Sequence, residues 1–228
     1  MSEFVFTPPD PAGIPIAGSD LLFPVRRVYC IGRNYAAHAI EMGHDPSREP
    51  PFFFQKNPDN LDASGVFPYP VRSDDVHFEV EMLVALGRGG VSIRPEAALA
   101  CVWGYGVGLD MTRRDLQDVA KAKSRPWEIA KAFERSAPVG SLHPAAEAGH
   151  PARGRIELKV NGSVRQAGDL DQMIWKTPEI IAHLSRYFEL APGDLIMTGT
   201  PAGVGAVARG DVMEAHVEGV GDLTVRVV

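Results

Sequence analysis

The chain has 228 residues, a hydrophobic content of 45% and a formal net charge of −6. We expect a compact single catalytic domain over residues 1–228, with an N-terminal wrap and a lid region within about residues 1–60. The absence of basic clusters argues against a nucleic-acid partner. No apolar run suits a membrane span and no leader-like segment opens the sequence, so we expect no membrane partner, a cytoplasmic location and two reduced core cysteines.

The first quarter of the chain mixes short apolar runs with proline-rich segments. Residues 1–25 are expected to wrap the surface, and 27–32 predict the first core strand. Residues 34–43 have Asn34 as an N-cap, an alanine-rich interior and a terminal glycine, which predicts a short helix. The irregular segment 45–51 is expected to act as a mobile lid. Three consecutive phenylalanines within 51–56 predict a buried strand.

Residues 77–86 carry the most informative pattern in the sequence. They alternate with period two, so Glu79 and Glu81 should share one face of a strand that has apolar residues on both sides. Asp110 ends a second apolar run, in which glycines at 104, 106 and 108 would let another backbone or a ligand come close.

Three carboxylates in such surroundings favour a bound cation. Buried acids that lie side by side repel one another unless a positive charge compensates them. Oxygen ligands favour Mg²⁺ or Mn²⁺, with Ca²⁺ possible in vitro. The alternative is that Glu79, Glu81 and Asp110 lie on a solvated edge or pair with lysine and arginine side chains.

The second half of the chain predicts more strands than helices. Helices are expected over 112–123 and over 177–188, with Thr177 as the N-cap of the second. Asn161-Gly162 between 155–160 and 163–166 is a strong hairpin signal, and further strands are expected at 194–198, 211–217 and 223–228. Because strands and helices do not alternate regularly, the predicted fold class is α+β with a mostly antiparallel sheet.

Several other side chains could take part in chemistry. His38 and Glu41 are three residues apart on one predicted helix, a pair that is often only a surface contact but could form a general base and its partner. Lys131 stands in an apolar context, either exposed or directed at an anion. Arg114 and Gln117 share a helical face near Asp110. The turn 198–205 lacks the features of a nucleotide loop, but its amides and Thr200 could hold a carboxylate.

Taken together, these segments resemble the fumarylacetoacetate hydrolase family. The matching stretches are 32–38, 77–81, 109–117, 159–162 and 198–205, and they cover nearly the whole chain in order. The resemblance is greatest to members that cleave fumarylpyruvate in the bacterial breakdown of gentisate. It implies a mixed β-roll with short peripheral helices, a homodimer, and Mg²⁺ or Mn²⁺ bound at Glu79, Glu81 and Asp110.

The resemblance also implies a reaction. A water activated by His38, with Glu41 orienting the imidazole, would cleave a small 2-oxo acid that is a 1,3-diketone, giving fumarate and pyruvate. Lys131 would steady the developing charge, and Gln117 would contact substrate. We expect Arg114 to bind the far carboxylate and Thr200 the near one. Relatives with the same metal ligands act as oxaloacetate decarboxylases or tautomerases, as other acylpyruvate hydrolases, or as hydroxymuconate isomerases. A non-catalytic binding protein and a nucleotide-binding module are the alternatives from other classes.

Overall fold

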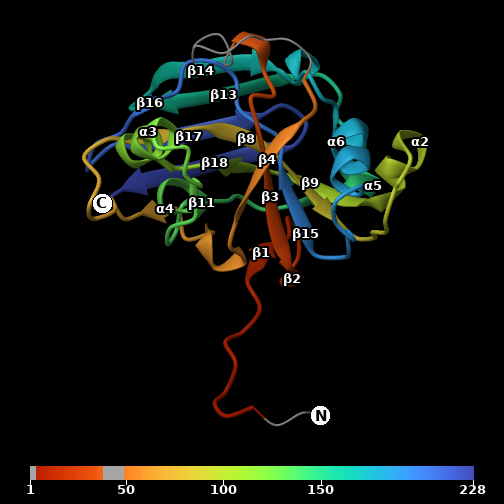
Figure 1. Ribbon diagram of the computed structural model, residues 1–228. Coiled ribbons are helices and arrows are strands. Elements are labelled where there is room, and N and C mark those ends of the chain that lie inside the picture. Colours follow the sequence, from red (N-terminus) through yellow and green to blue (C-terminus); the bar gives the residue numbers. More distant parts are fainter. Residues whose placement is uncertain (1–3, 38–48) are drawn as a thin grey trace.

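The computed structural model describes residues 4–37 and 49–228, and it is built on two β-sheets (Figure 1). The larger sheet has the strand order β12-β9-β8-β15-β3-β4. In that order the strands span His143–Pro144, Val102–Leu109, Val80–Leu86, Asp194–Met197, Arg27–Gly32 and Phe52–Lys56. Only β15 and β3 run parallel in this sheet, and the other neighbours are antiparallel.

The second sheet has the strand order β14-β13-β17-β18-β6. These strands span Ser163–Asp169, Arg155–Val160, Val212–Val217, Gly221–Val227 and Val66–Phe67. The predicted hairpin joins β13 to β14, and both turn residues, Asn161 and Gly162, have positive φ angles of 51° and 77°. Such angles define the tight turn that matches the twist of two antiparallel strands.

Short pairings and helices complete the architecture. The strand pairs are β1 (Gly13–Pro15) with β2 (Leu22–Pro24) and β5 (Leu61–Asp62) with β11 (Ala137–Pro138), and a small sheet orders β10 (Thr112–Arg113), β7 (Val76–Phe78) and β16 (Gly205–Ala206). The α-helices that lie entirely within the described residues are α2 (Pro95–Ala98), α3 (Arg114–Ala122), α4 (Glu128–Lys131), α5 (Ala145–Ala148) and α6 (Thr177–Leu184). The 3-10 turns are η1 (Pro58–Asn60), η2 (Leu99–Cys101) and η3 (Leu170–Gln172). The prediction of a mixed, mostly antiparallel fold with short peripheral helices is confirmed.

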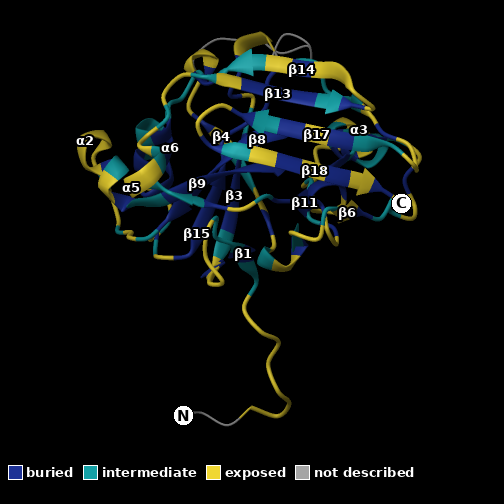
Figure 2. Cartoon of the chain, turned by 180° about the vertical axis from the view of Figure 1, so that it is seen from behind, coloured by how far each residue is buried: buried dark blue, intermediate teal, exposed yellow. Residues whose placement is uncertain are grey.

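Strand β8 lies at the centre of the core, and Figure 2 shows the buried strands around it. Every residue of β8 is buried. Met82 and Val84 pack into a cluster that includes Ile156 of the second sheet, whereas Leu83 and Ala85 pack into a separate cluster on the other side. The prediction that both faces of this strand are covered is therefore confirmed.

The alternating glycines of β9 serve the approach of another strand. A Cβ atom added at Gly104 would lie 2.4 Å from the carbonyl oxygen of His143 in β12. At Gly106 it would meet the Leu142 side chain at 2.9 Å. The absent side chains thus let the backbone segment beside β9 pack directly against it, which was one of the two predicted uses of these glycines.

Three local predictions were wrong. The strand of phenylalanines, β4, is only partly buried because it forms the edge of the larger sheet. Residues 4–10 project away from the body rather than wrapping it, and Val5 is 98% exposed. The helix α6 has Lys176 rather than Thr177 at its N-cap position, where Glu179 accepts a hydrogen bond from the Lys176 amide.

Candidate metal and substrate site

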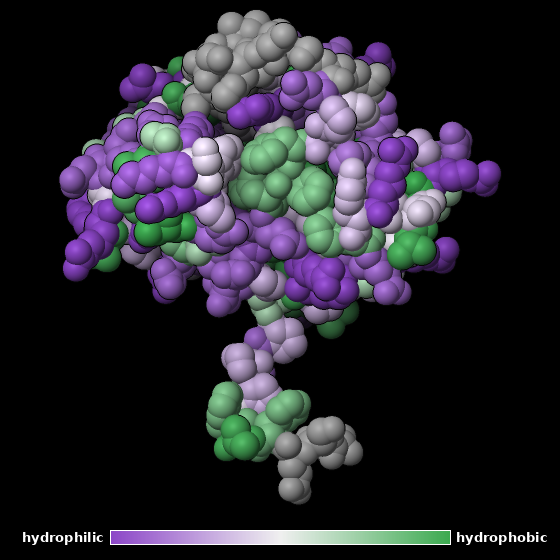
Figure 3. All heavy atoms as spheres, viewed as in Figure 1, coloured by the Kyte–Doolittle hydropathy of each residue, from purple (hydrophilic) through white to green (hydrophobic). Residues whose placement is uncertain are grey.

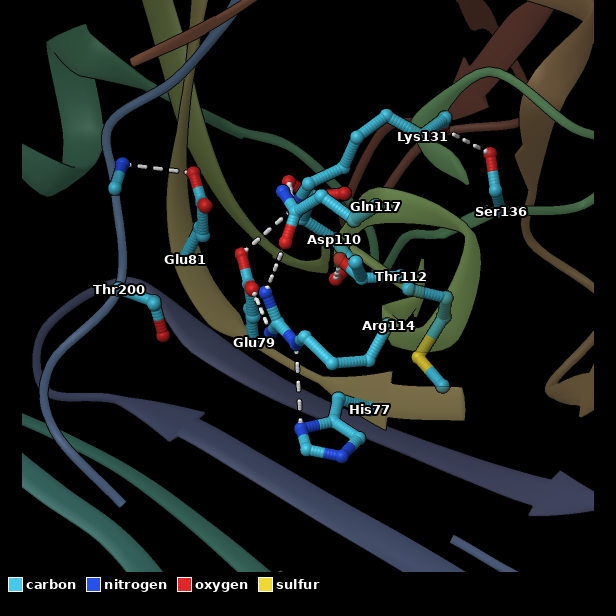
Figure 4. A network of polar contacts seen from close by, with 12 residues as sticks. His77, Glu79, Glu81, Asp110, Thr112, Arg114, Gln117, Lys131, Ser136 and Thr200 are labelled. Atoms are coloured by element: carbon cyan, nitrogen blue, oxygen red, sulfur yellow. Dashed lines mark hydrogen bonds and ion pairs between the residues drawn. The ribbon is translucent and has the colours of Figure 1, made fainter. Parts of the chain in front are cut away.

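Three acidic side chains from neighbouring strands meet in the core. Glu79, Glu81 and Asp110 each offer a carboxylate oxygen within 4.8 Å of the others, and their exposed fractions are 6%, 2% and 0%. Figure 4 shows these carboxylates turned toward one another. We call these three residues the acidic cluster.

Strand pairing explains why the acidic cluster forms. Glu81 lies in β8 opposite Gly108 of β9, and the amide of Asp110 donates a hydrogen bond to the carbonyl of Glu79 at 2.8 Å. The predicted acidic strand is interrupted at Glu79, which stands between β7 and β8. The interruption lets β7 leave the larger sheet and join β10 and β16.

Three buried cations of the protein surround two of these acids. The Lys131 ammonium lies 2.9 Å from Glu79 Oε2 and 2.6 Å from Asp110 Oδ2. Lys56 lies 2.9 Å from Asp110 Oδ1, and Arg114 lies 2.5 Å from Glu79 Oε1. Burial alone would lower the pKa of Lys131, but Asp110 and Glu79 outweigh it and raise that pKa, so the ammonium stays charged.

Glu81 lies in different surroundings. Its carboxylate accepts a hydrogen bond from the Gly199 amide at 2.7 Å, but no lysine or arginine among the described residues pairs with it. Burial raises the pKa of Glu81 well above its ordinary value, and the charges of Asp110 and Glu79 raise it further. Three buried carboxylates, of which Glu81 has no lysine or arginine paired with it in the described part of the chain, fit a hard divalent ion, because such an ion adds positive charge beside Glu81 and prefers oxygen ligands.

Arg114 starts α3 and is held from several sides. Its Nη1 donates to Gln117 Oε1 at 2.6 Å, and its Nε donates to His77 Nδ1 at 3.4 Å. His77 Nε2 in turn lies 2.9 Å from Asp75. Arg114 also pairs with Glu79 through Nη2, so each of its three guanidinium nitrogens has a protein partner.

The turn 198–205 is fixed against the site by two amide side chains. Asn34 donates to the carbonyl of Thr198 at 2.7 Å and accepts from the amide of Trp175 at 2.7 Å. Its side chain therefore joins separate segments, while most of the helix that it was predicted to cap lies outside the described residues. Gln166 Nε2 donates to Thr200 Oγ1 at 2.8 Å, and Gln166 Oε1 accepts from the amide of Val80 at 3.0 Å.

A pocket opens above the acidic cluster. Its lining includes the predicted residues Glu79, Glu81, Asp110, Arg114, Gln117, Lys131 and Thr200. The predicted pair His38 and Glu41 lies outside the described residues. The lining also includes Arg33, which belongs to the matching stretch 32–38 but had no assigned role. For the lining residues Phe52, Phe54, Lys121 and Trp127 no site role was predicted.

Lys56 is the buried functional group that sequence reasoning missed. Besides Asp110, its ammonium contacts the carbonyls of Met111 and Lys131 and the hydroxyl of Ser136. A signal existed, because Lys56 is two residues from Phe54 on a strand and so points to the same side. The three phenylalanines before it predict apolar packing and give no indication of a buried charge.

The structure also bears on the cysteines and on the expected absence of a membrane span. Cys30 and Cys101 are buried free thiols, as predicted, and burial raises the pKa of Cys30 well above its ordinary value. Among the described residues, no helix is both long enough and apolar enough to cross a bilayer.

Comparisons with known proteins extend this description. A family model described as fumarylacetoacetate (FAA) hydrolase C-terminal matches residues 27–228. The chain is 43% identical over 184 residues to a fumarylpyruvate hydrolase of a Ralstonia species, covering 80% of this chain and 95% of the relative. It is 42% identical over 195 residues to the mitochondrial oxaloacetate tautomerase FAHD1 of Rattus norvegicus, covering 86% and 88%.

A solved structure agrees over almost the whole chain. The crystal structure of fumarylpyruvate hydrolase from Pseudomonas aeruginosa in complex with Mn²⁺ and pyruvate superposes with a TM-score of 0.97 at 55% identity, covering 99% of each chain. Family model, sequence relatives and fold therefore agree, and this chain belongs to the fumarylacetoacetate hydrolase family.

Proposed function

We propose that this protein is a metal-dependent hydrolase that cleaves a carbon–carbon bond of a 1,3-diketone 2-oxo acid, with fumarylpyruvate as substrate and fumarate and pyruvate as products. The observation that carries the proposal is the acidic cluster at the base of the pocket, with Lys131 beside it. The similarity to two fumarylpyruvate hydrolases supports the choice of substrate.

Glu79, Glu81 and Asp110 are the proposed ligands of Mg²⁺ or Mn²⁺. The Pseudomonas aeruginosa enzyme was solved with Mn²⁺ and pyruvate, which makes a 2-oxo acid beside a divalent cation a reasonable arrangement here. When bound, the ion would act as a Lewis acid toward the enolate charge that bond cleavage creates. The Gly199 amide and the Lys131 ammonium hold ligand carboxylates in place.

His38 is the proposed general base and Glu41 the residue that orients it. The imidazole would take a proton from water as the oxygen attacks the carbonyl carbon distal to the 2-oxo acid end. The bond between that carbon and its neighbour then breaks, its electron pair moves to the pyruvate fragment as an enolate, and the fragment takes up a proton. Fumarate leaves as the acid formed at the attacked carbon.

Lys131 would donate hydrogen bonds to the oxygen on which negative charge develops. Its neighbours Asp110 and Glu79 keep it protonated, and its ammonium is buried in the pocket lining. A charged donor in a site shielded from water stabilises such an oxygen strongly. Gln117 and Thr200 are the proposed contacts of the 2-oxo acid end, with Arg114 holding Gln117 in position.

Oxaloacetate tautomerase or decarboxylase activity is the main alternative, and the similarity to the rat tautomerase favours it over the others. Another acylpyruvate hydrolase or a hydroxymuconate isomerase would use the same groups. Each of these reactions passes through an enolate next to a carboxylate, so the acidic cluster alone does not separate them.

An ultraviolet assay of substrate loss separates these activities. Purified protein with Mn²⁺ or Mg²⁺ is given fumarylpyruvate, acetylpyruvate or oxaloacetate in parallel. We expect the highest kcat/KM for fumarylpyruvate, with equal amounts of pyruvate and fumarate formed. If oxaloacetate is turned over best, the hydrolase assignment is wrong.

Replacing the proposed base tests the mechanism. His38→Ala should lower kcat by about a hundredfold or more while Mn²⁺ affinity and Tm stay unchanged. His216→Ala, on the partly exposed end of β17, is the matched control and should keep full activity. Normal turnover by His38→Ala would refute the proposed roles of His38 and Glu41.

The proposed assembly is a homodimer located in the cytoplasm. Light scattering coupled to size exclusion should give twice the mass of the 24.7 kDa chain. A single-chain mass at micromolar concentration would contradict this part of the proposal.

A further inference from the structure

The outer part of the pocket carries two cations that the proposed mechanism does not use. Arg33 and Lys121 line the same pocket as the acidic cluster. Arg33 directly follows β3, and Lys121 lies in α3. Arg33 is exposed and Lys121 is half-buried. They therefore lie where a ligand arriving from solvent can meet them.

Aromatic rings connect these cations to the acidic cluster. The Lys131 ammonium lies 5.0 Å from the centre of the Phe54 ring, and Phe54 lies 5.9 Å from Trp127 between ring centres. Trp127 contacts Phe52 edge to face at 5.1 Å. We call Phe52, Phe54 and Trp127 the aromatic wall. Figure 3 shows apolar side chains gathered on the face where Figure 1 places β4, the strand that supplies both phenylalanines.

The two outer cations lie against the other two rings of this wall. The Lys121 ammonium is 5.6 Å from the Trp127 ring centre, and the Arg33 guanidinium carbon is 5.6 Å from the Phe52 ring centre. Trp127 and Phe52 touch, so Arg33 and Lys121 lie against two neighbouring rings of the same pocket. Phe52 and Phe54 also lie 6.4 Å apart between ring centres, so the three rings form one compact group with Lys131 against Phe54, Lys121 against Trp127 and Arg33 against Phe52.

The outer cations differ from the inner ones in what they already bind. Lys56, Lys131 and Arg114 are buried and paired with the acidic cluster at 2.9 Å or less. The carboxylate nearest Lys121 belongs to Asp118, at 3.6 Å, and the Asp118 side chain is 64% exposed. A long, solvated contact of this kind contributes little and is readily exchanged for a ligand anion.

We infer that Arg33 and Lys121 bind the terminal carboxylate of a long, dianionic acylpyruvate, whose flat unsaturated chain lies on the aromatic wall while its 2-oxo acid end reaches the acidic cluster. This inference rests on the proposed function and refines its substrate class. It replaces the sequence-based expectation that Arg114 holds the far carboxylate, since Arg114 is engaged with Glu79, Gln117 and His77. Oxaloacetate lacks an unsaturated chain between its two carboxylates, and acetylpyruvate has no terminal carboxylate.

Selectivity between two substrates measures this subsite. The ratio of kcat/KM for fumarylpyruvate to kcat/KM for acetylpyruvate is determined for the wild type and for Lys121→Met and Arg33→Met. We expect each substitution to lower the ratio by about tenfold to a hundredfold, mainly through KM for fumarylpyruvate, because a charge-assisted hydrogen bond to the terminal carboxylate is lost. Lys121→Arg keeps the charge and should retain most of the ratio.

Lys123→Met is the matched control. Lys123 is an exposed lysine next to the end of α3, so its removal makes the same change in net charge without touching the pocket lining. Its substrate ratio should equal that of the wild type. If Lys121→Met and Arg33→Met also keep the wild-type ratio, the subsite is wrong although the hydrolase function stands. If the wild type does not hydrolyse fumarylpyruvate at all, the proposed function itself fails.

Discussion

The two ends of the pocket use positive charge in opposite ways. At the inner end, Lys56, Lys131 and Arg114 are buried and neutralise acids that the core strands bring together. At the outer end, Arg33 and Lys121 rest on aromatic rings at the edge of the larger sheet. Buried charges are costly to rearrange, whereas half-exposed ones can change partner at little cost. The inner end is therefore suited to holding fixed charges, and the outer end to exchanging one bound anion for another.

The strongest test of the inner end is removal of Lys56. Lys56→Met takes away one of two ammonium groups on Asp110, so the free energy of unfolding should fall by about 3 kcal/mol, near the lower limit for breaking a buried pair because Lys131 remains. Urea unfolding in the presence of a chelator measures the loss. Lys123→Met should change stability by less than about 0.5 kcal/mol.

A divalent ion should restore part of this loss. If Mn²⁺ sits among the three carboxylates, it replaces the charge that Lys56 supplied, and unfolding repeated with Mn²⁺ should show a larger gain for Lys56→Met than for the wild type. Equal gains in the two proteins would mean that Lys56 and the ion do not share Asp110.

An effect of similar size is expected from the backbone that holds Glu81. Gly199 has a φ angle of 96°, and a Cβ atom there would lie 2.7 Å from the Cβ of Asn34. Gly199→Ala should cost about 1 kcal/mol for the unfavourable backbone angle and a further 1–3 kcal/mol, roughly, for crowding. It should also weaken Mn²⁺ binding, because the amide that orients Glu81 shifts.

Gly210 offers a control with nearly the same backbone angle. Its φ is 94°, but a Cβ atom there would have no neighbour within 4 Å. Gly210→Ala should therefore show only the backbone cost and unchanged Mn²⁺ affinity by calorimetry. Equal Mn²⁺ affinities of Gly199→Ala and Gly210→Ala would show that the hydrogen bond to Glu81 has no role in metal binding.

The smallest effect concerns pH at the outer end. Burial lowers the pKa of Lys121, the charges of Arg114 and Lys131 lower it further, and Asp118 opposes them. A lowered pKa means that the ammonium loses its charge at a lower pH than an ordinary lysine does. The alkaline decline of kcat/KM for fumarylpyruvate should therefore move to higher pH in Lys121→Arg, because arginine stays protonated.

Acetylpyruvate provides the reference for that profile. Any alkaline decline of kcat/KM that the two substrates share comes from groups at the inner end. The ratio of the two profiles isolates the outer end, and a ratio that is independent of pH in the wild type would contradict a binding role for the Lys121 charge.

The inner end was largely visible in the sequence. Period-two alternation placed Glu79 and Glu81 on one side, and the position of Asp110 after a glycine-rich run marked its approach to them. The hairpin at Asn161-Gly162 and the strands on either side were equally local signals. Such features depend on neighbours in the chain, so the residue order alone determines them.

The outer end became visible only through tertiary structure. Phe54 and Trp127 are far apart in the chain and meet because the edge strand β4 lies beside the segment around α4. Lys56 reaches Asp110, and Arg33 and Lys121 flank one pair of rings, for the same reason. The sequence determined the acidic pair and the strands that carry it, whereas the packing of distant segments decided which cations and rings surround it, because those contacts exist only after the chain has folded.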